Sequence, residues 1–126
     1  MIQFTKTIKV LQKSGKIPIL VSPPPRVNFN IGDCLERETF DVITLGRESC
    51  NFSRLAYEVK MSGVISALLE VEKSANVKIL WVDELTCGEK LCKSKIDDVY
   101  LYRDGEHLSY AGSELLIQKF KILQKM

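Results

Sequence analysis

The sequence lacks several features that would place it quickly in a common class of protein. It has no block of five or more charges of one sign, and 18 basic residues against 16 acidic ones leave a formal net charge of only +2. Composition therefore gives no reason to propose nucleic acid as a partner. The longest apolar stretches, 17–21 and 77–82, are far shorter than the roughly 20 residues of a membrane-spanning helix. We expect no segment of this chain to cross a bilayer.

A secretory signal peptide is also missing, because residues 1–16 intersperse lysines among the apolar residues and have no small-residue cleavage site. Made alone, the chain is expected to remain cytoplasmic. Four cysteines (Cys34, Cys50, Cys87 and Cys92) nevertheless form an even set, which favours disulfides and an oxidising compartment. The conflict disappears if the chain is the tail of a longer exported protein with targeting and membrane segments upstream. Sequence cannot choose among the three pairings that four cysteines allow.

What the sequence does contain is an alternation of helical and strand-like patterns. Apolar spacing, caps and turn residues mark the segments. In the first half of the chain we expect a helix ending at 14–16, a buried strand at 17–21 that runs into three prolines, and mainly loop over 27–51 with a hint of strand at 42–45. A helix should then run from the cap Ser53 to about Ala75 and stop at Asn76, before a buried strand at 77–82 and an extended segment at 99–102. The last expected element is a helix after Ser109, with these residues inward: Ala111, Leu115, Leu116, Phe120 and Leu123.

This alternation predicts an α/β fold in which helices cover a small parallel sheet. Parallel sheets are normally covered on both faces and contain several strands. Two or three strands therefore look like the end of a larger domain. No internal repeat suggests another architecture.

The only histidine, His107, follows Asp104 by three positions. A tight turn through Gly105 would bring the Asp104 carboxylate against one imidazole nitrogen and leave the other nitrogen free as a general base. The competing interpretation is a surface histidine before a helix cap, stabilised by a nearby carboxylate.

The fuller segment from Tyr102 to Gly112 reads Tyr-x-Asp-x-x-His-Leu-Ser-x-x-Gly. It resembles the last conserved block of the SGNH (GDSL-like) hydrolase family, as found in the extracytoplasmic domains of membrane-linked O-acyltransferases of the acyltransferase 3 type. The opening helix, the strand before the prolines, the long middle helix and the Cys87/Cys92 loop also resemble the C-terminal half of those domains. The resemblance implies a partial three-layer α/β/α, flavodoxin-like fold. It also assigns Asp104 as the orienting acid and His107 as the base of a Ser-His-Asp triad.

The family's Gly-Asp-Ser nucleophile block and its oxyanion-hole glycine and asparagine are not recognisable in this chain. An Asp-His pair without an activated hydroxyl cannot form an acyl-enzyme, and losing oxyanion donors costs roughly 100- to 1000-fold in rate. We therefore expect residues 1–126 to be the C-terminal portion of one SGNH domain and to be inactive alone.

A substitute nucleophile is conceivable in Gly32-Asp33-Cys34, where a thiol replaces the serine hydroxyl. A structural disulfide and a free buried thiol are the alternatives for Cys34. A zinc site built from the cysteines and His107 is a weaker hypothesis, because Cys87 and Cys92 do not have a recognised zinc spacing. We expect no metal and no cofactor.

Two further groups of residues have ordinary explanations. Asp83 and Glu84 follow a predicted strand and could line a site, although solvated strand-end carboxylates are commoner. Trp81, Tyr100 and Tyr102 are most simply core or pocket-wall aromatics.

The function implied by the resemblance is O-acyl (acetyl) transfer, or ester hydrolysis, on a cell-envelope polysaccharide or lipopolysaccharide. The substrate would be an acylated carbohydrate, the location periplasmic or extracytoplasmic within a membrane-linked parent, and the partner an upstream transmembrane acyltransferase segment or a complementary chain. The alternative is a noncatalytic α/β module that binds carbohydrate or protein. Exposed apolar surface beside the sheet would favour the partial domain, and a closed sheet edge would favour the independent module.

Overall fold

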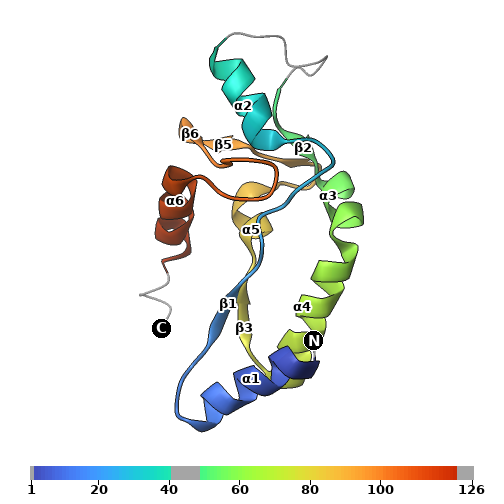
Figure 1. Cartoon of the computed structure of the whole chain (residues 1–126), viewed down its shortest axis with the longest axis vertical. Coiled ribbons are helices and arrows are strands. Elements are labelled where there is room, and N and C mark those ends of the chain that lie inside the picture. Colours follow the sequence, from blue (N-terminus) through green and yellow to red (C-terminus); the bar gives the residue numbers. More distant parts are fainter. Residues whose placement is uncertain (1, 41–48, 122–126) are drawn as a thin grey trace.

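A computed structural model of the protein describes residues 2–40 and 49–121 (Figure 1). The helices are α1 (Ile2–Lys13), α2 (Ile31–Thr39), α3 (Arg54–Lys60), α4 (Ser62–Ala75), α5 (Val82–Thr86) and α6 (Tyr110–Phe120). The strands are β1 (Ile19–Val21), β2 (Phe52–Ser53), β3 (Lys78–Leu80), β4 (Leu91–Cys92), β5 (Lys95–Ile96) and β6 (Val99–Tyr100). Within these described ranges, no helix has the length and hydrophobicity needed to span a membrane.

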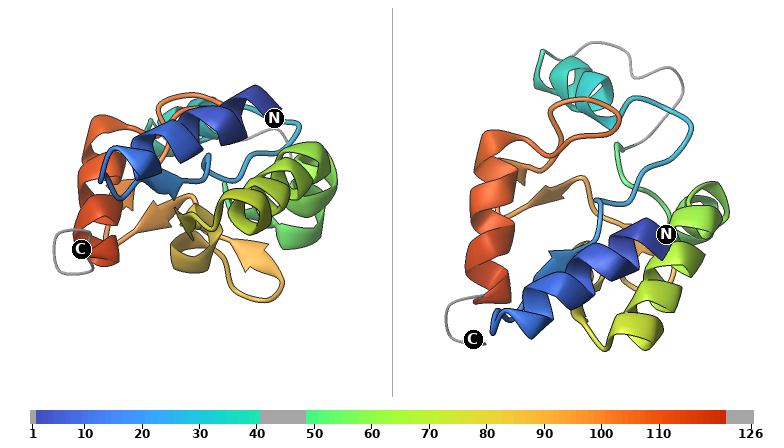
Figure 2. Two further views of the ribbon diagram at one scale, coloured as in Figure 1. Left: turned by 90° about the horizontal axis from the view of Figure 1, so that it is seen from below. Right: turned by 60° about the horizontal axis from the view of Figure 1, so that its bottom comes forward.

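The centre of the fold is a parallel pair of strands, β1 and β3, with Leu20 opposite Ile79. Successive strand residues face opposite sides of a sheet. Accordingly, Leu20 packs on the cluster formed by α1 and α4, whereas Ile19 packs on the cluster that includes Leu116 of α6. Helices thus cover both faces, which gives the three layers of a mixed α/β fold, as predicted (Figures 1 and 2).

A second and larger core lies at the end of the molecule that holds α2, α3 and the short strands (Figure 1). The ring of Phe52 meets that of Tyr102 edge to face, with 6.1 Å between centroids. Two antiparallel pairs, β2 with β4 and β5 with β6, surround this core. This second core supports the loop that contains Asp104 and His107.

The expectation that residues 27–51 are mainly loop is wrong, because α2 occupies Ile31–Thr39. Asn30 caps this helix by accepting a hydrogen bond from the backbone N–H of Asp33 at 2.9 Å. Cys34 and Leu35 are buried on its inner face, so a short amphipathic helix forms where the asparagines and Gly32 suggested turns. The strand hinted at 42–45 lies outside the described residues.

The long helix predicted from Ser53 to Ala75 is divided into α3 and α4 at Met61. Ser53 caps α3 through the backbone N–H of Ala56, and Asn76 ends α4 with a left-handed φ of 50°, as predicted. Helices often bend at Gly/Ser pairs, and Ser62-Gly63 directly follows the break.

The terminal helix also begins as predicted, with Ser109 as its cap. Leu116 and Phe120 are buried and Leu115 is half-buried, but Ala111 is exposed, contrary to expectation. Leu123 lies outside the described residues.

The four cysteines form two disulfides, Cys34–Cys50 and Cys87–Cys92. The first bond joins α2 to the segment before β2. The second closes the loop between α5 and β4, which leads toward the turn with Asp104 and His107.

Candidate active site

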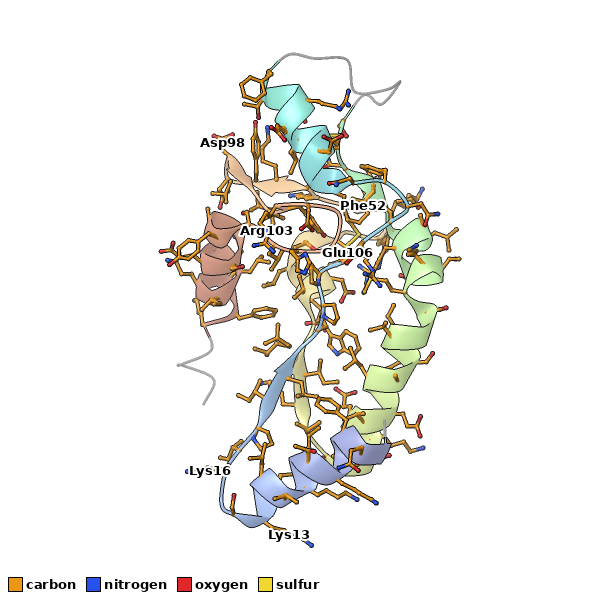
Figure 3. All side chains as sticks on the ribbon, in the orientation of Figure 1. Lys13, Lys16, Phe52, Asp98, Arg103 and Glu106 are labelled. Atoms are coloured by element: carbon orange, nitrogen blue, oxygen red, sulfur yellow. A yellow bond between two sulfur atoms is a disulfide. The ribbon has the colours of Figure 1, made fainter. Side chains whose placement is uncertain are left out.

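The candidate site is built on a short turn between β6 and α6. Tyr102 and Leu108 form a β-bridge at its base, and the backbone N–H of Arg103 donates to the carbonyl of His107 at 2.9 Å. In Figure 3 the labelled Arg103 and Glu106 mark this turn, between α2 and α5. The bridge brings the two ends of the turn together and so holds Asp104 close to His107.

The Asp104 carboxylate contacts both the backbone and the ring of the turn that contains it. Its Oδ1 accepts the backbone N–H groups of Glu106 and His107, each at 2.8 Å. His107 Nδ1 lies 3.1 Å from Oδ1 and 3.0 Å from Oδ2. Because an ionised carboxylate can only accept hydrogen bonds, Nδ1 carries a proton, and in the neutral form of the ring Nε2 then keeps its lone pair.

These donors hold the Asp104 carboxyl in its charged form. Its pKa falls from 3.8 to about 2, chiefly because the backbone N–H of Glu106 donates to it. Partial desolvation opposes this effect, while the backbone and the ring of His107 lower the pKa further. Asp104 is therefore ionised at neutral pH and can orient the imidazole ring and stabilise it as imidazolium.

The His107 ring lines an open pocket of about 420 Å³. The other walls come from the Arg26–Asn30 segment, from Lys60 of α3 and from the turn itself. The His107 side chain is 59% exposed, and no described residue hydrogen-bonds Nε2. This nitrogen can therefore accept a proton from a group that enters the pocket.

Among the described residues that line this pocket there is no serine, threonine or cysteine. The pocket thus presents a base and its orienting acid without a hydroxyl or thiol that the base could activate.

The Gly32-Asp33-Cys34 segment does lie beside the turn, but it does not supply a nucleophile. Cys34 is bonded to Cys50, which excludes both the thiol-nucleophile and the free-thiol hypotheses for this form of the protein. Gly32 instead serves packing, since its N–H donates to the carbonyl of Asp104 at 3.2 Å. A Cβ atom at this position would lie 2.5 Å from the carbonyl oxygen of Arg103.

The disulfides also remove the thiolate ligands on which the zinc hypothesis depends. All four cysteine sulfurs are joined in pairs, so none can bind a metal as a thiolate. No group of three or more histidine, cysteine, aspartate or glutamate residues in the described ranges could hold a metal ion.

The remaining residues of the sequence motif fix the turn in place. The buried hydroxyl of Tyr102 donates to the carbonyl of Pro25, and burial raises the pKa of this hydroxyl, which keeps it protonated. Ser109 accepts the N–H of Gly112 at 2.9 Å and donates to the carbonyl of Tyr100 at 2.6 Å. The motif therefore specifies a rigid turn as well as a His-Asp pair.

Sequence reasoning missed Arg26. Its Nη1 lies 3.1 Å from the Glu106 carboxylate, so it joins the loop after β1 to the turn. The signal that could have found it is its position directly after Pro23–Pro25, because the loops at the carboxyl ends of parallel strands often line sites.

Of the two carboxylates that follow β3, Asp83 differs from the expectation of a solvated strand-end group and Glu84 agrees with it. Asp83 is buried and pairs with Arg54 of α3 at 2.6 Å, whereas Glu84 is exposed. Both line a second pocket, which also contains Trp81. Tyr102 is a core aromatic and Tyr100 is half-buried, as expected.

Comparison with known proteins gives one finding. A family model described as "SGNH domain (fused to AT3 domains)" matches residues 2–121. No curated protein and no solved structure matches the chain. The matched range includes both strands of the parallel sheet and the turn with Asp104 and His107.

Proposed function

Because the chain belongs to the family of SGNH domains fused to acyltransferase-3 domains, we propose that it supplies the histidine and aspartate of a Ser-His-Asp triad. Membership of this family indicates an acyl-transfer or esterase-like role and confirms the resemblance seen in the sequence. The specific proposal is O-acyl transfer, with acetyl as the acyl group, or ester hydrolysis, on a cell-envelope polysaccharide. The observation that carries it is the His107 ring, held at Nδ1 by Asp104 and open to the pocket at Nε2.

The proposed chemistry follows from these two nitrogens. Nε2 of His107 takes the proton of a serine hydroxyl while the serine oxygen attacks the acyl carbonyl, and the resulting imidazolium then protonates the departing oxygen. In the second half, Nε2 takes a proton from a sugar hydroxyl or from water, which attacks the acyl-enzyme. The proton then returns to the serine oxygen. Asp104 stabilises the imidazolium in both halves.

The serine in this proposal belongs to a segment outside the 126 residues, either an upstream part of a membrane-linked acyltransferase or a complementary chain. The absence of a hydroxyl among the described pocket residues supports this. The sheet supports it too. Within the described ranges β1 pairs with β3 alone, and two apolar side chains are largely exposed there: Val21 of β1 at 54% and Ile17 just before β1 at 84%. Parallel strands are normally covered, so this edge suits further strands of the same domain.

The two disulfides support an extracytoplasmic location, since such bonds persist in oxidising compartments. Fusion to an acyltransferase-3 domain, as in the family, would place the site next to a membrane-bound source of acyl groups.

The test begins with the DNA upstream of the Met1 codon, read for a Gly-Asp-Ser block that can be joined to this chain. We expect the chain alone to hydrolyse p-nitrophenyl acetate no faster than its His107→Ala variant. The joined protein should be active, and His107→Ala or Asp104→Asn should lower its kcat by about 10³-fold or more.

The matched control is Asp98→Asn, which removes an exposed carboxylate from a left-handed hairpin position that asparagine tolerates. It should leave the activity unchanged. Robust activity of the isolated chain that is lost in His107→Ala would contradict the missing nucleophile. Unrelated upstream sequence together with an inactive chain would favour the noncatalytic binding module.

A further inference from the structure

A second pocket, of about 450 Å³, lies near the His107 pocket at the same end of the sheet. Trp81 follows β3 directly and Asp83 lies in the first turn of α5, while Arg26 lies in the loop after the parallel strand β1. The loops at the carboxyl ends of the two strands therefore lie on one side, where open α/β sheets bind ligands. Helix α3 contributes to both sites, with Lys60 lining the His107 pocket and Tyr57 lining the second pocket.

The cation in this second pocket is Arg54, and each of its three guanidinium nitrogens donates one hydrogen bond. Arg54 donates from Nε to Glu58 at 2.9 Å, from Nη1 to the carbonyl of Gly88 at 3.1 Å and from Nη2 to Asp83 at 2.6 Å. Glu84 also lines the pocket, so its walls contain three carboxylates and one guanidinium and have a net negative charge. Such a site repels anionic ligands and accepts neutral or cationic ones.

The other walls combine a flat ring with hydrogen-bonding groups. Trp81 is half-buried, and the exposed Ser62 and Ser66 have no hydrogen-bond partner among the described side chains. Ile65 and Leu69 supply apolar surface. This composition suits a sugar ring, whose C–H face packs on an indole while its hydroxyls bond to carboxylates and serines.

Asp83 adds an observation of its own. Its Oδ1 is buried and has no hydrogen-bond partner among the described residues. Because Oδ1 is enclosed by protein atoms, a carboxylate acceptor that is open to a ligand in this pocket is that of the exposed Glu84.

We propose that the pocket formed by Trp81, Asp83, Glu84, Ser62 and Ser66 is a carbohydrate subsite. It holds a neutral or amino sugar unit and rejects an acidic one. Its link to acyl transfer rests on the proposed function, because a polysaccharide bound here would extend toward His107. The binding itself does not depend on the triad.

Trp81 is the only tryptophan, so its fluorescence reports on this pocket alone. We would titrate the whole chain with trisaccharides of glucose, of glucosamine and of glucuronic acid. The first two should produce a saturable change in emission. The acidic one should bind about tenfold more weakly or not at all, as expected for repulsion between like charges.

Variants separate this subsite from the catalytic pair. Glu84→Gln should weaken saccharide binding about tenfold, because it removes a charged acceptor and keeps the shape. His107→Ala should bind saccharide like the unaltered chain. Circular dichroism would verify that both variants fold.

The proposal is overturned if no saccharide changes the emission, if the glucuronic acid trimer binds as tightly as the others, or if Glu84→Gln binds normally. Binding of N-acetyl-lysine amide without saccharide binding would also overturn it and would point to a basic peptide. Saccharide binding that persists when the joined protein lacks acyl transfer would sustain the subsite and remove the proposed function.

Discussion

Asp104 is held by the backbone of the turn as well as by the imidazole. Two N–H groups reach its Oδ1 from Glu106 and His107, so the carboxylate is positioned even when the ring moves. A general base needs this kind of support, since its orienting acid must not rotate during proton transfer. The same hydrogen bonds make Asp104 a measurable source of pH dependence.

The sign of that dependence follows from the lowered pKa. The carboxyl titrates near 3.8 when unfolded and at about 2 when folded, so its contribution to stability is present above pH 4 and is lost as the pH falls toward 2. We expect the free energy of unfolding of the unaltered chain to exceed that of Asp104→Asn at neutral pH, with the gap closing between pH 4 and 2.

Urea unfolding at several pH values measures this gap, and Asp98→Asn corrects for the loss of one exposed carboxylate. A gap that stays constant down to pH 2 would mean that the backbone donors do not stabilise the charged form.

At the scale of elements, two helices pack closely on the segment before His107, because each has a glycine in its first turn. We call this pair of contacts, at Gly32 and Gly112, the clamp. A Cβ on Gly32 of α2 would lie 2.5 Å from the Arg103 carbonyl oxygen, and one on Gly112 of α6 would lie 2.7 Å from the Leu101 carbonyl oxygen. The N-terminal turn of α2 therefore approaches the backbone at 103–104, and that of α6 approaches it at 101. This close approach fixes the position of the turn relative to the helices.

Gly32→Ala tests the clamp. The added methyl group meets backbone that cannot easily shift, so we expect a loss of about 1–3 kcal/mol in the free energy of unfolding and a changed NMR signal for the His107 ring. Gly63→Ala is the matched control, because nothing lies within 4 Å of its Cβ position in α4. It should stabilise the helix by about 0.5–1 kcal/mol. Equal effects of the two substitutions would contradict the clamp.

At the scale of the whole molecule, the part of the chain that the structure describes is stabilised by three hydrophobic clusters and two disulfides. The two clusters beside the parallel sheet are small, and the sheet has two strands within residues 2–40 and 49–121. Small cores leave little margin of stability, which makes covalent links important. Cys34–Cys50 closes the longer of the two loops, with a sequence separation of 16 against 5 for Cys87–Cys92.

Replacing each cysteine pair by alanine should therefore have unequal effects. In the chain-entropy description, removal of Cys34–Cys50 lowers the free energy of unfolding by about 3 kcal/mol and removal of Cys87–Cys92 by about 2 kcal/mol. Chemical denaturation of the two double variants under oxidising conditions measures both values. A larger loss of the free energy of unfolding when Cys87–Cys92 is removed would contradict this expectation. It would show that this bond stabilises the folded state directly, through the turn that contains Asp104 and His107.

The features predicted correctly from sequence depend on short stretches of chain. The capping serines Ser53 and Ser109, the apolar strands and the Asn76 helix end are recognisable because each acts within a few residues. The closeness of Asp104 and His107 is local as well, since three residues and one turn separate them. The family motif was recognisable for the same reason.

The features that sequence reasoning missed depend on contacts between distant segments. Helix α2 forms where the asparagines and Gly32 favour turns, because its buried face and its disulfide stabilise it. The burial of Asp83 requires Arg54, 29 residues away. The sequence by itself therefore determined the helix caps, the two strands of the parallel sheet and the closeness of Asp104 to His107. Only the tertiary structure decided the cysteine pairing, the pocket walls and the second pocket, because those arise where nonlocal packing outweighs local preference.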